Sequence, residues 1–151
     1  MEPLKLIKHV KGAPGLRFLG LGPNLKPSQG LIELKKLLVN YAFWAKERNI
    51  KDLRKCLGCS SVVISLWRGN RMVGFGRATT DEIYRAVLWD VVVAEDLQGQ
   101  GLGSLVVKAL LESPSINKAE RIYLMTSNSS EFYEQFNFKI SDTQKLLVKQ
   151  Y

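Results

Sequence analysis

The spacing of apolar residues predicts two helices in the first third of the chain. Residues 28–44, "SQGLIELKKLLVNYAFW", carry apolar side chains three or four positions apart, as on the buried face of a helix, and Ser28 supplies a cap. The run "IKDLRKCLG", residues 50–58, fits a second, shorter helix closed by its glycine. Residues 1–27 are rich in glycine and proline, so we expect an irregular lead-in there, with at most a short strand over residues 16–19.

Beyond residue 60 the apolar residues form short stretches rich in β-branched and aromatic side chains, which predicts strands. Two such stretches within residues 61–80 flank Gly69-Asn70, a dipeptide suited to a hairpin turn. Residues 85–94, "RAVLWDVVVA", predict a strand covered on both faces, because their apolar character is almost continuous. The later elements are predicted to be a helix, a strand, a short helix and a closing strand or hairpin: residues 102–112, 121–127, 129–136 and 138–151.

The order of these elements predicts the topology. Short turns join the first three strands, so those strands should be antiparallel, whereas the helix over residues 102–112 makes a right-handed crossover to a parallel neighbour. We therefore expect one domain over residues 28–151 of mixed α/β (α+β) class. Its central mixed sheet is mostly antiparallel, with one parallel strand pair and helices on both faces.

Composition and charge narrow the classes of partner. The 151 residues suffice for a proper core, and 46% are hydrophobic and 24% charged, which is ordinary for a globular protein. No apolar stretch is long enough to span a bilayer, and the start lacks the apolar region of a secretory signal, so we expect an intracellular protein without membrane contact. The net charge of +8 favours an anionic partner, but the basic residues are scattered, so nucleic acid is not the expected one.

Cys56 and Cys59 form a C-x-x-C pair that suggests metal or redox chemistry. A zinc site would need two further ligands, and the only histidine is His9, in what we expect to be a mobile tail. A redox pair would follow a strand and open a helix, whereas this pair follows a helical segment. We interpret the cysteines as two half-buried thiols and expect no metal.

The glycine-rich "QGQGLG", residues 98–103, lies between a predicted strand and a predicted helix. A Walker A loop would need a lysine before Ser104, and a dinucleotide fingerprint that starts at Gly99 would need glycine in place of that serine. The pattern Q/R-x-x-G-x-G/A, in contrast, is met in full by Gln98, Gly101 and Gly103.

The physical chemistry of this loop suits a diphosphate. A helix N-terminus offers unpaired N–H groups and partial positive charge, and glycines let successive amides converge without a Cβ in the way. Gln98, Gln100 and Ser104 could add side-chain donors. The alternative interpretation is a glycine-rich turn that binds nothing.

With this motif the chain resembles the GNAT superfamily of acetyl-coenzyme A-dependent N-acetyltransferases over roughly residues 30–140. The later segment "NSSEFYEQFNF" is similar to the family's second cofactor segment, although Asn137 replaces its usual glycine. The stretch "LWDVVV…QGQGLG" resembles the small cyanobacterial and plastid members that include plant serotonin N-acetyltransferases. The resemblance implies a GNAT-like sheet whose parallel pair splays apart, with acetyl-coenzyme A bound by Val91, Val92, Val93, Gln98, Gly99, Gln100, Gly101, Leu102, Gly103, Ser104, Asn128, Phe132 and Tyr133.

Acetyl transfer needs a neutral amine, a polarised carbonyl and a proton for the departing thiolate. Backbone N–H near Val92 or Val93 is the expected oxyanion donor. Tyr133 matches the tyrosine that lies near the coenzyme sulfur in many family members, and it is the candidate acid. Asp90 is the candidate base, because burial in an apolar strand could raise its pKa, or else a structural carboxylate bonded to Arg77 or Arg85.

Other residues remain as alternatives at this stage. Asp81 and Glu82, before the strand over residues 85–94, could act as the base through water. Strand alternation places Asp90 on the face opposite Trp89, and Trp89 could wall an aromatic acceptor by apolar contact or by cation–π interaction.

The acceptor is expected to be a primary amine attacked within a ternary complex. An arylalkylamine such as serotonin follows from the narrower resemblance, which also links the chain to melatonin biosynthesis and to a cytoplasmic (cyanobacterial-type) or plastid stromal location. A protein N-terminus or lysine is the alternative acceptor. A non-catalytic coenzyme A-binding regulator and a small nucleic-acid-binding module are the alternative classes. An exposed edge strand near the C-terminus could pair two subunits into a homodimer.

Overall fold

The computed structural model describes residues 2–10 and 30–151, which form a five-stranded sheet and its covering helices. The strands lie in the order of the sequence, and only the last pair is parallel. Their bounds are Leu4–Val10 for β1, Val62–Arg68 for β2, Arg71–Thr80 for β3, Arg85–Val93 for β4 and Arg121–Leu124 for β5. The mixed, mostly antiparallel sheet predicted from the sequence is therefore confirmed.

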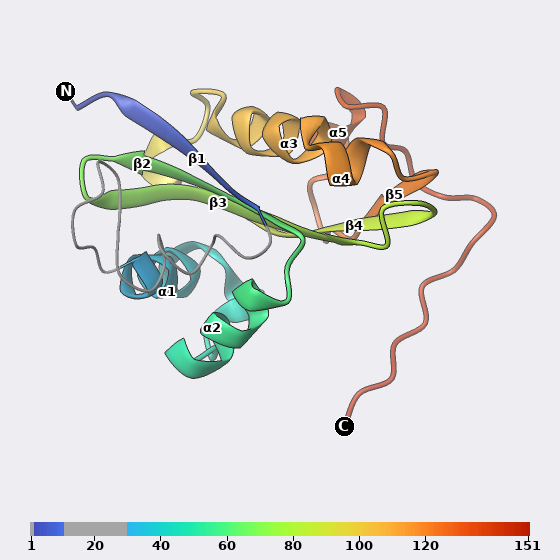
Figure 1. The fold of residues 1–151 in the computed structure, drawn as a ribbon, viewed down its shortest axis with the longest axis horizontal. Helices are drawn as coiled ribbons and strands as arrows, with labels where there is room; N and C mark the ends of the chain where they lie inside the picture. The colour runs from blue at the N-terminus through green and yellow to red at the C-terminus, as the bar shows by residue number, and fades with distance from the viewer. Residues whose placement is uncertain (1, 11–29) are drawn as a thin grey trace.

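Helices cover both faces of this sheet. In Figure 1, α1 and α2 lie below it, and α3, α4 and α5 lie above it. Their bounds are Gly30–Tyr41 for α1, Ile50–Gly58 for α2, Leu102–Glu112 for α3, Pro114–Asn117 for α4 and Ser130–Glu134 for α5, with short 3₁₀ helices η3 at Phe43–Ala45 and η4 at Glu95–Leu97.

The core consists of the apolar faces that these elements turn toward each other. Leu34 and Leu38 of α1 pack from one side, and Val106 and Leu110 of α3 pack from the other, all fully buried. Since helices cover both faces, β2 and β3 contain runs of consecutive buried positions instead of alternating with solvent, as a doubly covered sheet requires. None of the described helices is both long enough and apolar enough to traverse a membrane.

The strand β1 was not expected, because residues 1–27 were predicted to be irregular. Residues 4–10 pair antiparallel with β2 along their whole length. The alternation of apolar and polar residues in this strand is hard to recognise in the sequence, because a histidine occupies a buried position. His9 is 2% exposed, and its ring contacts the Ser65 hydroxyl at 3.1 Å, so the expectation of a mobile tail at His9 is wrong. The expected strand over residues 16–19 and the cap at Ser28 lie outside the described residues.

The closing strand or hairpin predicted over residues 138–151 is also wrong. The structure assigns no helix or strand there, and Leu146, Leu147 and Val148, whose β-propensity suggested a strand, are exposed. Such residues form strands only where an adjoining strand or surface accepts them. Figure 1 shows this segment leaving the body of the protein.

Candidate functional site

The parallel strands β4 and β5 separate partway along β4, which opens the sheet. Their pairing runs from Arg85 opposite Arg121 to Leu88 opposite Leu124, and β4 then continues to Val93 while β5 ends. The chain beyond Leu124 instead lines a cavity beside β4. The splay implied by the resemblance is therefore present.

The register of β3 and β4 determines which amides of β4 face the opening. Ala94 N–H donates to the Val73 carbonyl at 2.9 Å, and the pairs that precede it along β4 are Val93 opposite Gly74 and Val92 opposite Phe75. Successive amides of a strand point to opposite edges, so the Val93 N–H points toward the edge that β5 has left. Val93 suits an oxyanion donor better than Val92, whose amide faces β3.

A β-bulge distorts β4 beside the opening. Phe75 is opposite Val92 and Arg77 is opposite Trp89, so Asp90 and Val91 together face the single residue Gly76. Asp90 takes up the extra residue with a left-handed φ of 55°, which is rare outside glycine, asparagine and aspartate.

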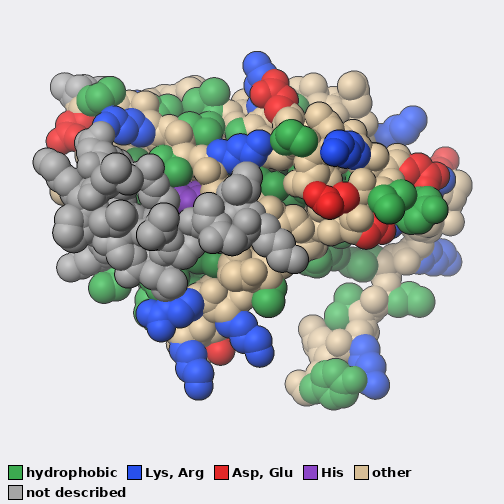
Figure 2. Space-filling view, in the orientation of Figure 1, with side chains coloured by type: hydrophobic (Ala, Val, Ile, Leu, Met, Phe, Trp, Pro, Cys, Tyr) green, Lys and Arg blue, Asp and Glu red, His purple; other side chains and the backbone are tan. Residues whose placement is uncertain are grey.

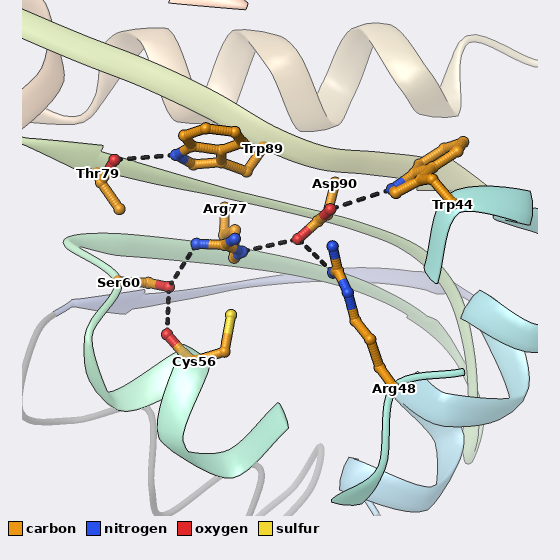
Figure 3. Close-up of polar contacts among 8 residues, drawn as sticks. All are labelled: Trp44, Arg48, Cys56, Ser60, Arg77, Thr79, Trp89 and Asp90. Carbon is orange, nitrogen blue, oxygen red and sulfur yellow. Dashed lines mark hydrogen bonds and ion pairs between the residues drawn. The ribbon is translucent and has the colours of Figure 1, made fainter. Parts of the chain in front are cut away.

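This bulge changes the direction of the Asp90 side chain. Arg77 donates from Nε to the Asp90 carboxylate at 2.8 Å and also stacks on the Trp89 ring, with 5.6 Å between Cζ and the ring centroid. Asp90 and Trp89 therefore lie on the same side of the sheet, as Figure 3 shows. The expectation that they occupy opposite faces is wrong, because regular alternation fails at a bulge.

Three donors hold the Asp90 carboxylate (Figure 3). Besides Arg77, Arg48 donates from NH1 at 2.8 Å and Trp44 donates from Nε1 at 3.1 Å. Of the two residues proposed from the sequence as structural partners, Arg77 is one and Arg85 is not, since Arg85 pairs with Glu120. Arg77 also reaches the Ser60 hydroxyl at 3.4 Å, and that hydroxyl donates to the Cys56 carbonyl.

The electrostatics of this cluster oppose the sequence-based argument for Asp90 as a base. Burial by itself raises the pKa of Asp90, but the hydrogen bonds and charges of Arg48 and Arg77 outweigh it and hold the pKa below its usual range. The expectation of a raised pKa is therefore wrong. The sequence analysis did not identify Arg48 as a partner of Asp90, because Arg48 lies 42 residues away in the sequence and belongs to no motif.

A cavity of about 510 Å³ lies between β4, η3 and the segment after β5. Phe43 and Trp44 form one wall, Trp89 and Val91 line the strand side, and Tyr133 lies on α5. Phe43 and Trp44 were expected at the end of the helix predicted over residues 28–44 and were not chosen as site residues, but α1 ends at Tyr41 and both residues lie in η3. This cavity is the candidate acceptor site.

Tyr133 is buried at the boundary between this cavity and a neighbouring one. It packs against Phe132 and Phe138, with ring centroids 4.9 Å and 5.9 Å away. Burial raises the pKa of the Tyr133 phenol. The hydroxyl therefore stays protonated at neutral pH, which is the state that an acid requires.

The glycine loop has the local geometry expected of an anion cradle. Gly99 and Gly101 are left-handed, with φ of 82° and 79°, and a Cβ at either would meet nothing within 4 Å. Gly101 is the N-cap of α3, so the first amides of that helix, beginning at Leu102, have no intrahelical acceptor. Gln98 and Gln100 are exposed beside them.

Other predicted cofactor residues have packing roles of their own. A Cβ on Gly103 would lie 3.2 Å from the Phe132 ring, so this glycine allows α5 to approach α3. Ser104 donates its hydroxyl to the Gln135 side chain at 3.1 Å, and Asn128 lines the acceptor cavity. Asn137 has a φ of 67° and thus adopts the left-handed conformation that a glycine would supply.

Within the described ranges, 2–10 and 30–151, no group of three or more histidine, cysteine, aspartate or glutamate side chains could hold a metal ion. Cys56 is half-buried and Cys59 exposed, and both are free thiols. Burial raises the pKa of the Cys56 thiol, so it lacks the thiolate character of a reactive cysteine.

Comparison with known proteins agrees with this geometry. The family model "Acetyltransferase (GNAT) domain" matches residues 59–140. An uncharacterized N-acetyltransferase of Pyropia yezoensis, ycf52, is 32% identical over 139 residues, or 89% of this chain and 79% of that protein. GCN5-related N-acetyltransferase 2, chloroplastic, of Arabidopsis thaliana is 34% identical over 70 residues, or 46% of this chain and 27% of that protein.

The fold is also found among solved structures. A GNAT-family acetyltransferase from Xanthomonas campestris pv. campestris superposes with a TM-score of 0.74 at 19% identity, covering 100% of this chain and 95% of that one. Sheet, splay, glycine loop and family match agree, and the chain belongs to the GNAT family of N-acetyltransferases.

Proposed function

We propose that this acetyltransferase moves the acetyl group of acetyl-coenzyme A directly to a primary amine that carries an aromatic ring. The observation that supports this proposal most strongly is the opening between β4 and β5. It lies between the glycine N-terminus of α3 and a cavity walled by aromatic side chains. A thioester bound along β4 would thus face an aromatic acceptor across the strand.

The residues of the glycine loop fit acetyl-coenzyme A. The open, left-handed Gly99 and Gly101 let the diphosphate approach backbone amides closely, and the partial positive charge of the α3 N-terminus favours it. Gln98, Gln100 and Ser104 are close enough in the chain to contribute polar side chains. The pantetheine arm would pair with the free edge of Val91–Val93.

The transfer step needs little more than positioning and charge stabilisation. The amine nitrogen attacks the thioester carbonyl carbon, and the Val93 N–H stabilises the negative charge that develops on its oxygen. The carbon–sulfur bond breaks, Tyr133 gives its proton to the departing thiolate, and solvent restores it. The amine proton leaves to water.

No buried carboxylate is needed as the base in this scheme. Both oxygens of Asp90 already accept hydrogen bonds, and Arg48 and Arg77 hold its pKa below the usual range. Asp81 accepts backbone hydrogen bonds from Arg85, Ile83 and Tyr84, and these bonds lower its pKa. Its carboxylate thus stabilises the loop before β4. Glu82, in the same loop, remains available to act through water.

Phe43, Trp44 and Trp89 favour an acceptor with an aromatic ring, and serotonin is one such amine. A protein N-terminus or lysine remains the second acceptor to test. The chloroplastic relative from Arabidopsis thaliana supports a plastid location, and a cyanobacterial-type cytoplasmic location is the alternative.

We also propose a homodimer. Among the described residues, β5 pairs only with β4, and the apolar side chains of Ile140, Leu146, Leu147 and Val148 are exposed in the segment that follows α5. Two copies could therefore cover each other's edge strands.

The test is release of free thiol when acetyl-coenzyme A is mixed with arylalkylamines, polyamines or peptides. We expect amine-dependent release with at least one arylalkylamine. Gly101→Val should weaken acetyl-coenzyme A binding tenfold or more, on the order expected for a β-branched residue forced into a left-handed conformation at a ligand contact. Gly58→Val is the matched control, because Gly58 has open space around it.

Each contrary outcome has a definite meaning. Binding of acetyl-coenzyme A without thiol release for any amine would favour a non-catalytic regulator. Indifference to acetyl-coenzyme A, with steeply salt-dependent binding to DNA or RNA, would favour a nucleic-acid-binding module. Wild-type affinity in Gly101→Val would remove the diphosphate from the glycine loop.

A further inference from the structure

We propose that Arg48 forms an anion-binding subsite in the acceptor cavity and selects amines that carry a carboxylate beside the amine. This inference rests on the proposed function, because it concerns the same cavity, and it goes further by stating the charge of the acceptor.

The cavity offers no free carboxylate to an ammonium group. Asp90 and Arg48 are the charged side chains among the described residues that line it. The side chain of Asp90 is only 6% exposed, and Trp44, Arg48 and Arg77 already occupy its oxygens. An incoming cation would have to displace a guanidinium group to reach it.

The aromatic ring on the strand side of the cavity, that of Trp89, already interacts with a cation of the protein itself. The guanidinium of Arg77 lies over the Trp89 ring, so the protein's own cation takes the cation–π position that was expected for the substrate. The Trp89 Nε1 donates to the Thr79 hydroxyl at 2.9 Å and fixes the ring (Figure 3). Trp89 can still offer apolar contact, but the face that Arg77 covers is not open to an ammonium group.

The remaining charge in the cavity is positive. The guanidinium groups of Arg48 and Arg77 face the single carboxylate of Asp90, which leaves a formal charge of +1. Lys35 lies outside the cavity lining, and its ammonium group donates to the backbone carbonyl of Arg48, which ties α1 to the segment that carries Arg48. Asp90 supplies a negative charge from β4, and η3, α5 and the Leu124–Ser129 segment bring no charged side chain to the lining.

Arg48 is the member of the cluster that a ligand can reach. Its side chain is 35% exposed and lines the cavity, whereas that of Arg77 is 15% exposed and lies behind Asp90. Only NH1 of Arg48 bonds to Asp90, so the planar fork retains donors for a second anion. Phe43 and Trp44 would hold an aromatic ring beside it.

The surrounding surface is consistent with this charge. Lys46, Lys51, Arg54 and Lys55 are exposed on or next to α2, and Figure 2 shows basic side chains gathered where α2 lies in Figure 1. This field attracts anions toward the same side of the sheet as Arg48. It surrounds the subsite but does not form it.

The experiment compares amines that differ only in the carboxylate, namely tryptophan with tryptamine and phenylalanine with phenethylamine. For each pair, kcat/KM is measured in the wild type and in Arg48→Met. Within each pair, we divide kcat/KM of the amine that carries the carboxylate by kcat/KM of the amine that lacks it. This acid-to-amine ratio should fall about tenfold or more in the variant, which is the scale of one charge-assisted hydrogen bond. The different pKa values of the amines cancel, because they are the same in both enzymes.

Arg54→Met is the matched control. It removes one positive charge from α2 at an exposed position, so it tests the general field without touching the cavity. The acid-to-amine ratio should change less than twofold there, since surface charges are strongly screened. Equal changes in Arg48→Met and Arg54→Met would overturn the subsite.

Direct binding separates this inference from the proposed function. Indole-3-propionate has the ring and the carboxylate but no amine, and its affinity for the wild type with bound coenzyme A can be measured by calorimetry against 3-propylindole. Tighter binding of indole-3-propionate than of 3-propylindole supports the subsite even if no arylalkylamine is acetylated. Failure to acetylate any arylalkylamine would contradict only the proposed class of acceptor. Equal binding of the acid and the neutral indole overturns the subsite, even if Arg48→Met fails to fold.

Discussion

At the level of single residues, the position of Tyr133 is fixed by its ring and not by its hydroxyl. The ring packs against Phe132 and Phe138, and only 9% of the residue is exposed. Because no described partner accounts for the placement of the hydroxyl, its removal should leave the ring where it is. Tyr133→Phe therefore separates chemistry from structure.

We expect Tyr133→Phe to lower kcat by roughly 100-fold, the lower range for loss of a general acid. The affinity for acetyl-coenzyme A, measured at equilibrium, should stay within about twofold. Burial raises the pKa of Tyr133, so the acid is protonated below that pKa and is lost only as the pH rises through it, above about 10. A kcat equal to the wild type would exclude Tyr133 as the acid.

The charge state of Asp90 could not be predicted from the sequence around it. Its place in an apolar run suggested a carboxylate with a raised pKa, but the residues that decide its charge state lie on other elements. Arg48 follows η3, and Arg77 is on β3. The bulge that turns Asp90 toward them depends on register, which local patterns do not determine.

At the level of elements, the packing of α3 on the sheet depends on a glycine in β3. A Cβ on Gly76 would lie 2.6 Å from a methyl group of Val106 and 3.1 Å from one of Leu110, both fully buried. The close approach of α3 therefore requires the absence of a side chain at this position. Since α3 also carries the glycine loop, any displacement of the helix would move the proposed diphosphate site.

We expect Gly76→Ala to lower the free energy of unfolding by about 1–3 kcal/mol, as overpacked cores do. Gly58→Ala is the control. It lies at the end of α2 with nothing within 4 Å of a Cβ, and should be neutral or stabilising by up to ~1 kcal/mol. Urea unfolding of both variants checks this, and similar stability losses in the two would contradict the packing argument.

The elements that were predicted well are those with strong local periodicity. The bounds of α2 and α3 match the structure, and the hairpin of β2 and β3 lies where its turn dipeptide placed it. Gly101 could be proposed as a cofactor residue because its pattern is local and contiguous. The strand β1 was missed because its buried position at residue 9 is occupied by a histidine, which interrupts the alternation of apolar and polar residues. The strand predicted over residues 138–151 is absent because β-propensity does not supply a neighbouring strand to pair with.

The candidate site was predictable to a similar degree. The glycine loop and α5 carry contiguous motifs, so the sequence was enough to propose their residues. The acceptor walls Phe43 and Trp44 and the cation Arg48 come from the connection between α1 and α2, and they meet β4 only through tertiary packing. No local pattern records such contacts.

At the level of the whole molecule, the two edges of the sheet differ. In Figure 1, β1 lies at one edge, and β5 lies at the other, near the point where the C-terminal segment departs. A second cavity of about 530 Å³ lies between β5 and residues 138–146. Leu147 is 89% exposed just beyond it. In a dimer with a two-fold axis, the exposed apolar segment of each copy could cover the β5 edge of the other copy. Such an interface repeats the same contacts twice.

We therefore expect the wild type to have the mass of a dimer by light scattering, with dissociation on dilution. The triple variant Leu146→Asp, Leu147→Asp, Val148→Asp should be monomeric, because burying carboxylates against an apolar edge is costly. The double variant Gln144→Glu, Gln150→Glu adds charge to the same segment without removing apolar area, so it should remain a dimer. A wild type that is monomeric at every concentration would exclude the homodimer. A triple variant that still dimerises would assign the interface to another surface.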